Sequence, residues 1–199
     1  MAEFAEDVRR VAAAAGVAPP VVEVWREKRL AILRLRPDGT LLFIHPALLG
    51  MPRVARLGII AHELAHVARR DLVFRRWLFP GVLTALLLVE VPILVWLVFQ
   101  LFDGRWWALP LAPVIWLAGS VGGRILILAI RRRQEYAADS AAASTLGGAD
   151  PVVAYLDWLT AHNAELPPAP LPVRLWNATH PSNAARRAAI LRAYHPKLS

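Results

Sequence analysis

Two long apolar runs dominate the pattern of hydrophobic and polar positions. Residues 77–101 contain one ionisable side chain, Glu90, and residues 106–130 contain one, Arg124. In a helix that rises about 1.5 Å per residue, either run is long enough to cross about 30 Å of hydrocarbon. A buried core helix is the alternative, but a chain of 199 residues has too little other protein to cover two such helices. We therefore expect two transmembrane helices, joined by residues 102–105 as an antiparallel hairpin.

The two charges inside these runs leave several interpretations open. Intramembrane charges usually pair or mark a pathway. Glu90 and Arg124 differ in depth by roughly 10 Å, so an ion pair needs an extended arginine. Otherwise Glu90 is protonated against a neighbour, or Arg124 reaches the lipid phosphates. Gly119 and Gly123 lie four residues apart, and this spacing lets helices approach closely.

The rest of the pattern predicts a small α+β domain that the hairpin interrupts. Before the hairpin we expect a helix over residues 3–15 and a helix over about 53–70, with short strands between them. After it we expect a helix to about Leu146 and two more helices. The predicted fold is therefore a mostly α integral membrane protein, in which residues 77–130 divide an α+β domain into residues 1–76 and 131–199. The three strands are expected over 21–25, 30–35 and 41–44, and the last two helices begin near Asp150-Pro151 and Ser182.

The charges set the expected orientation of the chain. The formal net charge is +8, and the mean hydropathy of +0.42 is high for a soluble globular protein. The arginines flank the apolar runs rather than forming a basic domain with interleaved aromatics, which argues against nucleic acid as a partner. By the positive-inside rule, both ends of the hairpin lie in the cytoplasm. No secretory signal opens the chain, so we expect both termini to be cytoplasmic. The flanking arginines are Arg69, Arg70, Arg75 and Arg76 before the hairpin and Arg131, Arg132 and Arg133 after it.

The sequence His62-Glu63-Leu64-Ala65-His66 carries the clearest chemistry. On a helix, His62 and His66 project from one face and can hold one zinc ion, while Glu63 addresses a metal-bound water. A pair of helix histidines that only satisfies its hydrogen bonds is the alternative. The chain has no cysteine, which excludes thiolate zinc sites and disulfides and leaves histidines and carboxylates as the strong metal ligands.

A zinc ion held by two histidines of this helix needs a third protein ligand. The hairpin returns the chain to the membrane face that it left, so Glu135 arrives beside His62 and His66. Asp139 follows Glu135 by four residues and shares its helix face. One of these carboxylates can bind metal, while the other orients a histidine or pairs with an arginine.

These motifs, in this order, resemble the HtpX-like membrane zinc metallopeptidases of the HExxH type, relatives of the CAAX prenyl protease. The motifs are HELAH, the two-helix insertion, Glu135-x-x-Ala138-Asp139 and Thr179-His180-Pro181 followed by Arg186. The resemblance implies a zincin-like domain with one Zn²⁺ per chain, bound by His62, His66 and Glu135, with Glu63 as general base. By the same resemblance, His180 stabilises the oxyanion, although a helix-capping turn also explains it. Arg186 then supports His180 or Asp139, and Asp71 occupies a position that is often acidic in the family.

The family implies a metalloendopeptidase that cleaves membrane or membrane-adjacent proteins, often in quality control. Its partners here would be a protein substrate and the lipid bilayer of the inner membrane, and an oligomer remains open. Two departures are visible: Arg29-Leu30-Ala31 stands where the family often has Asn-Ala on the strand before the zinc helix, and relatives often have four or more membrane helices. The sheet either binds substrate at an edge strand or only packs on the helix. The sensor-transducer metallopeptidases of beta-lactam resistance, and a scaffold with a structural zinc site, are the alternative functions.

Overall fold

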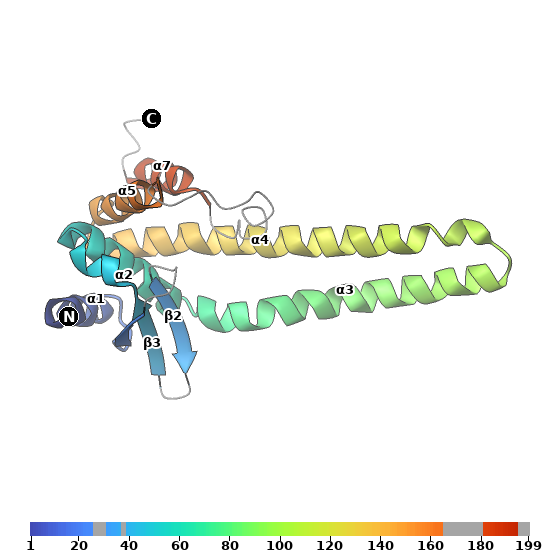
Figure 1. The fold of residues 1–199 in the computed structure, drawn as a ribbon, viewed down its shortest axis with the longest axis horizontal. Coiled ribbons are helices and arrows are strands. Elements are labelled where there is room, and N and C mark those ends of the chain that lie inside the picture. Colours follow the sequence, from blue (N-terminus) through green and yellow to red (C-terminus); the bar gives the residue numbers. More distant parts are fainter. Residues whose placement is uncertain (26–30, 37–38, 165–180, 195–199) are drawn as a thin grey trace. The chain divides into compact units, whose positions relative to one another are not determined.

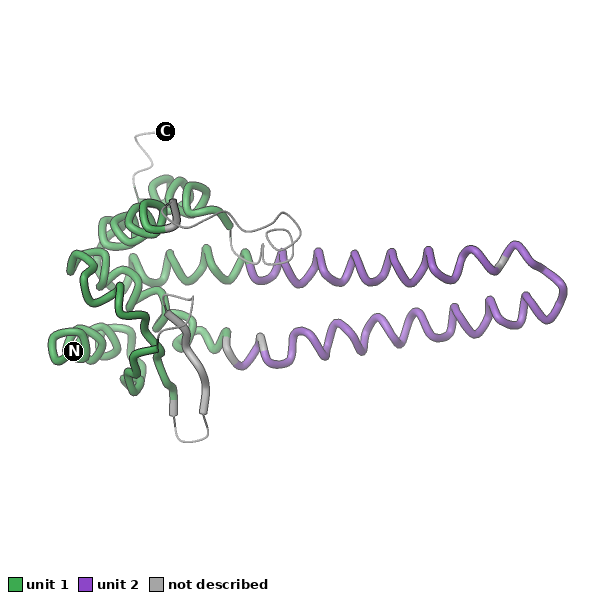
Figure 2. The backbone as a smooth tube through the Cα atoms, in the orientation of Figure 1, with its two compact units in different colours: residues 1–72, 132–199 green, residues 73–131 purple. Residues whose placement is uncertain are grey.

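The computed structural model of this chain describes residues 1–25, 31–36, 39–164 and 181–194 (Figure 1). The chain divides into two compact units, residues 1–72 with 132–199 and residues 73–131 (Figure 2). The first unit contains helices and a small sheet, and the second consists of helical segments only. The prediction of a mostly helical protein with a small sheet is therefore confirmed.

The first helix of the first unit is α1, Ala2–Ala14. Its buried apolar side chains, Phe4, Val8 and Val11 among them, recur at helical spacing and pack against the zinc-motif helix α2, Arg53–Ala68. Gly16, with φ at 66°, allows the chain to turn after α1, because glycine adopts positive φ without a steric penalty.

A buried ionic cluster fastens α1 to α2. The Asp7 carboxylate on α1 is 1% exposed and accepts hydrogen bonds from Arg53 and Arg56 of α2, each with an Nη2–oxygen distance of 2.9 Å. Burial raises the pKa of Asp7, but the hydrogen bonds and positive charges of the two arginines outweigh this effect and lower the pKa overall. Asp7 is therefore charged and paired at neutral pH.

The sheet has three strands, in the order β1-β3-β2. Strand β1 (Val21–Val24) pairs with β3 (Gly39–Ile44) in parallel, and β2 (Ala31–Arg36) pairs with β3 in antiparallel from Ala31–Ile44 to Arg36–Gly39. The strands expected over 30–35 and 41–44 are therefore present, and residues 37–38 between them lie outside the described residues. Strand β2 is an edge strand of this sheet and contacts α2.

Helix α2 forms the centre of the first unit and packs closely on α5, Asp150–Ala164. Gly58 makes this approach possible, because a Cβ atom at that position would lie 2.0 Å from the Pro151 carbonyl oxygen. The short 3-10 helix η1 (Pro46–Gly50) precedes α2, and the last helix, α7 (Asn183–Tyr194), packs on α5. The core gathers side chains from α1, β3, η1, α2, α5 and α7, together with Ala142 and Ala143 of α4.

The second unit contains most of α3 (Asp71–Phe102) and the first part of α4 (Leu111–Leu146), with the 3-10 helix η2 (Trp106–Ala108) between them. Both helices are long and apolar enough to cross a membrane. Only 11% and 6% of their most apolar windows are buried, which does not fit the covered core helices of a soluble protein.

The bounds of the second apolar helix differ from those expected. Residues 106–110 were expected inside it, but α4 begins only at Leu111. Pro110 and Pro113 favour a start here, since proline fits the first turn of a helix well, although α3 also accommodates Pro80 and Pro92 in its interior. Helix α4 then continues beyond residue 130 without a break and ends at Leu146, just before Gly147.

The two small residues predicted to permit close approach lie against α3. A Cβ atom on Gly119 would fall 1.5 Å from Glu90 Oε1, and one on Gly123 would fall 2.7 Å from Leu86 Cδ1. Glu90 Oε1 is buried and has no hydrogen-bond partner among the residues that the structure describes. The structure therefore favours the interpretation in which Glu90 faces a neighbouring helix.

Candidate active site

His62 and His66 lie on α2 one turn apart and both are buried, at 5% and 4% exposure. Their ring centroids are 4.9 Å apart, with the rings nearly perpendicular. The i, i+4 spacing places both imidazoles on one face of the helix, as the sequence predicts.

Glu135, on the part of α4 that belongs to the first unit, meets this pair. Its side chain is 1% exposed, and its two carboxylate oxygens lie 3.4 Å from His62 Nε2 and 3.5 Å from His66 Nε2. One ligand atom from each of the three residues lies within 4.8 Å of the others. The structure thus brings together the three residues expected to hold the metal, although residues 73–131 separate two of them from the third.

The geometry of these donors fits a zinc ion. Zinc binds imidazole nitrogen and carboxylate oxygen at about 2.0–2.2 Å in a tetrahedron, whose edges are then about 3.3 Å long. The separations of 3.4 Å from His62 Nε2 to Glu135 Oε2 and 3.5 Å from His66 Nε2 to Glu135 Oε1 are each close to the length of such an edge, and they involve different carboxylate oxygens. Two imidazoles and one carboxylate are also a donor set typical of hydrolytic zinc sites, with a fourth position left for water or substrate.

Each histidine presents its Nε2 atom to Glu135, and a second carboxylate holds its Nδ1 atom. His62 Nδ1 lies 2.8 Å from Asp139 Oδ1, and His66 Nδ1 lies 3.0 Å from Asp71 Oδ2. Such carboxylates fix the tautomer and the ring orientation of metal-binding histidines. Asp139 and Asp71 therefore contact the histidines rather than completing the group of possible metal ligands.

Arg186, on α7, joins the site through Asp139. Its Nε atom lies 2.7 Å from Asp139 Oδ2 and its Nη2 atom 2.6 Å from Oδ1, so the guanidinium binds both oxygens of the carboxylate. Burial raises the pKa of Asp139, but the hydrogen bonds from Arg186 and His62 lower it by more, so the net shift of the pKa is downward. Asp139 is therefore a charged acceptor. Of the two roles expected for Arg186, the structure shows the contact with Asp139.

Tyr155, on α5, is a site residue that sequence reasoning missed. It is 1% exposed, and its hydroxyl donates to Asp139 Oδ1 at 3.1 Å and accepts a hydrogen bond from Arg186 Nη2. Burial raises the pKa of Tyr155 well above its usual value, so the hydroxyl keeps its proton. One signal in the sequence could have identified it. Tyr155 follows Val152 at helical spacing, which predicts a tyrosine on a buried helix face, and the hydroxyl of a buried tyrosine usually has a hydrogen-bond partner.

The remaining expected residues differ in what the structure shows of them. Glu63 is partly exposed and makes no ion pair or hydrogen bond with any described residue, so its carboxylate is available. His180, the expected oxyanion-stabilising residue, lies outside the described residues. His45, which is not among the expected site residues, lies at the start of η1, where its Nδ1 atom accepts a hydrogen bond from the Ala47 amide at 3.2 Å.

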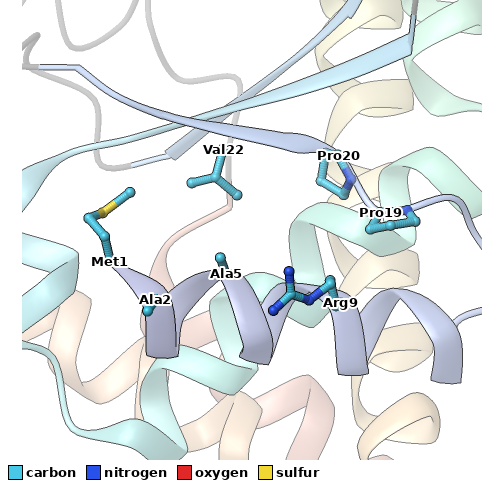
Figure 3. A pocket seen from close by; sticks show the side chains of 7 residues that line it. All are labelled: Met1, Ala2, Ala5, Arg9, Pro19, Pro20 and Val22. Carbon is cyan, nitrogen blue, oxygen red and sulfur yellow. The ribbon is translucent and has the colours of Figure 1, made fainter.

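A separate cavity of about 430 Å³ lies between α1 and the segment that leads into β1. Figure 3 shows Arg9 of α1 on one side and Pro19, Pro20 and Val22 on the other. None of the expected site residues lines this cavity, so it is not the metal centre.

Comparison with known proteins supports the chemistry of this site. No match is found among curated proteins. The sequence model of peptidase family M48 matches residues 5–194, a range that includes the HELAH motif, Glu135, Asp139 and Arg186. The predicted resemblance to HtpX-like metallopeptidases is thereby confirmed. Because the match extends over nearly the whole chain and includes every described residue of the three-donor site, the chain belongs to peptidase family M48.

Proposed function

We propose that this chain is a zinc-dependent metalloendopeptidase that cleaves membrane or membrane-adjacent proteins at the cytoplasmic face of the inner membrane, in protein quality control. The buried group of His62, His66 and Glu135 carries this proposal. The carboxylates of Asp139 and Asp71 at the two Nδ1 atoms support it further. A histidine that binds a metal through one ring nitrogen typically donates its other ring N–H to a carboxylate.

The proposed chemistry is hydrolysis without a covalent intermediate. When bound, zinc supplies Lewis acidity to the scissile carbonyl and lowers the pKa of water to about 7. Glu63 accepts a proton from the attacking water and passes it to the leaving amine. Its lack of a partner among the described residues leaves both oxygens free for these transfers. His180 remains the proposed oxyanion-stabilising residue.

We also propose that the substrate binds as an extended strand along β2. Strand β2 pairs with β3 along one of its two edges. No strand in the described part of the chain pairs with the other edge of β2. An extended peptide satisfies its backbone groups by adding to such an edge. Strand β2 contacts α2, the helix that carries both histidines, so a peptide on this edge lies near the proposed ligands.

The membrane setting of the proposal follows from α3 and α4. The proposed zincin-like domain consists of residues 1–76 and 131–199, divided by the membrane segment 77–130. Arginines precede the first apolar run and follow the second, so the positive-inside rule assigns both connections to the cytoplasm. Substrates should therefore present the scissile segment close to the cytoplasmic surface.

The experiment that tests this function separates catalysis from metal binding. The full chain is purified in detergent, its zinc content is measured by elemental analysis, and digestion of casein and of an unfolded membrane protein is followed. Glu63→Gln should keep one zinc per chain and lose cleavage, because only the proton acceptor is removed. Glu135→Ala should lose most of the zinc as well.

Glu23→Gln is the matched control, since Glu23 is an exposed carboxylate of β1 outside the site. It should behave as wild type in both measurements. Full cleavage by Glu63→Gln would refute the role of Glu63. A zinc-loaded wild type that cleaves neither protein would favour a scaffold with a structural zinc site instead.

A further inference from the structure

We propose that Tyr155 is a positioning residue of the metal centre, and that its hydroxyl keeps Arg186 directed at Asp139 so that His62 remains free to bind the metal. This inference rests on the proposed zinc site. Tyr155 touches none of the three proposed ligands by a hydrogen bond, and it acts through the two residues that surround His62.

Asp139 Oδ1 is the point where this network meets. It lies 3.1 Å from the Tyr155 hydroxyl, 2.6 Å from Arg186 Nη2 and 2.8 Å from His62 Nδ1. The Tyr155 hydroxyl donates its proton to Asp139 and offers its lone pair to Arg186 Nη2. One hydroxyl thus makes a hydrogen bond with each member of the Asp139–Arg186 pair.

Arg186 also lies close to the histidine that it supports. Its Nη2 atom is 3.2 Å from His62 Nδ1 and 3.5 Å from His62 Nε2. Nε2 is the atom that faces Glu135 and must keep its lone pair for the metal. An N–H group of Arg186 directed at this ring would compete with the metal, and the Tyr155 hydroxyl provides that N–H group with another acceptor.

The ring of Tyr155 contributes to the same arrangement. Its centroid is 5.7 Å from that of His62, and the Arg186 guanidinium carbon lies 5.5 Å from the ring centre. This contact stabilises the arginine over the aromatic face. Tyr155→Phe retains the ring and removes only the hydroxyl, so it separates the positioning role from packing.

The test measures zinc affinity of the detergent-purified full chain by competition with a chromophoric chelator. Groups that touch a metal ligand typically contribute 10–100-fold to metal affinity, and Tyr155 acts one contact further out. We expect Tyr155→Phe to raise the zinc Kd by about tenfold, at the lower end of this range. Tyr155→Leu, which also removes the ring, should lower the thermal midpoint of the metal-free chain further without a comparable additional loss of zinc affinity.

Tyr194→Phe is the matched control. The Tyr194 hydroxyl bonds Ser144 Oγ at 2.8 Å on the same unit but contacts no site residue, so its removal should leave the zinc Kd unchanged. A zinc Kd of Tyr155→Phe within twofold of wild type would overturn the positioning role while leaving the zinc site intact. Failure of the wild-type chain to bind zinc would overturn the proposed function together with this inference.

Discussion

The close contact between α2 and α5 at Gly58 gives the sharpest prediction about how the fold supports the site. In Gly58→Ala, the new Cβ atom would lie 2.0 Å from the Pro151 carbonyl oxygen and 3.2 Å from Tyr155 Cβ. Cβ atoms are essentially never found closer than 3.0 Å to another heavy atom, so the two helices must separate by at least about 1.0 Å. The obstructing atom belongs to the backbone and cannot rotate away.

This separation has an energetic cost and a geometric one. Overpacking costs up to about 3 kcal/mol, and the higher helix propensity of alanine returns about 1 kcal/mol, which leaves a net loss of about 2 kcal/mol. For a chain of this length, such a loss lowers the thermal midpoint by about 4–8 °C. A retreat of α5 by 1.0 Å would also stretch the Tyr155–Asp139 hydrogen bond from 3.1 Å to about 4 Å.

Two assays follow these effects in parallel. Thermal unfolding of the metal-free chain reports the packing loss, and the zinc Kd from chelator competition reports the loss of the hydroxyl contact. Gly148→Ala is the control, because a Cβ atom at Gly148 meets nothing within 4 Å. A Gly58→Ala chain that melts at or above the wild-type temperature and keeps the wild-type zinc Kd would refute this account of the α2–α5 contact.

Two further predictions concern Asp71, which contacts His66 in the site, and Asp7, which joins α1 to α2. Asp71→Asn should raise the zinc Kd about 10–100-fold, measured by the same competition assay, because it removes the charged acceptor 3.0 Å from His66 Nδ1. Asp7→Asn should lower the thermal midpoint at pH 7. The pKa of Asp7 is lowered in the folded chain, so its contribution to stability is present above the unfolded value of about 3.9 and is lost as the pH falls through the lower folded value. The midpoints of wild type and Asp7→Asn should therefore converge as the pH falls below about 4; a constant difference would contradict the ionic role of Asp7.

Local patterns predicted most helices and strands of this chain. The spacing of Phe4, Val8 and Val11 and the Gly16 stop define α1, and the HELAH helix was expected over about 53–70 and observed over Arg53–Ala68. The start of α4 was wrong because the prediction considered only hydropathy and ignored Pro110 and Pro113. Hydropathy changes near residue 130, but nothing there breaks the helix, and the structure shows one continuous element.

Within the site, the sequence predicted the residues that share one helix face. His62 with His66, and Glu135 with Asp139, are both i, i+4 pairs, and this spacing is a local property. The expectation that Glu135 reaches the histidines depended on a helical hairpin that returns the chain to the membrane face from which it started. The structure brings the three donors together.

The sequence by itself determined the two apolar helices, the paired histidines and the donor types available for a metal, because composition and periodicity act over short stretches of chain. The tertiary structure alone decided which side chains surround these donors. Tyr155 of α5 and Arg186 of α7 both reach Asp139 of α4, in a packing arrangement where α5 approaches α2 closely over Gly58. Such meetings depend on differences of about 1 Å in helix separation, which result from packing among residues far apart in the chain and which no local pattern encodes.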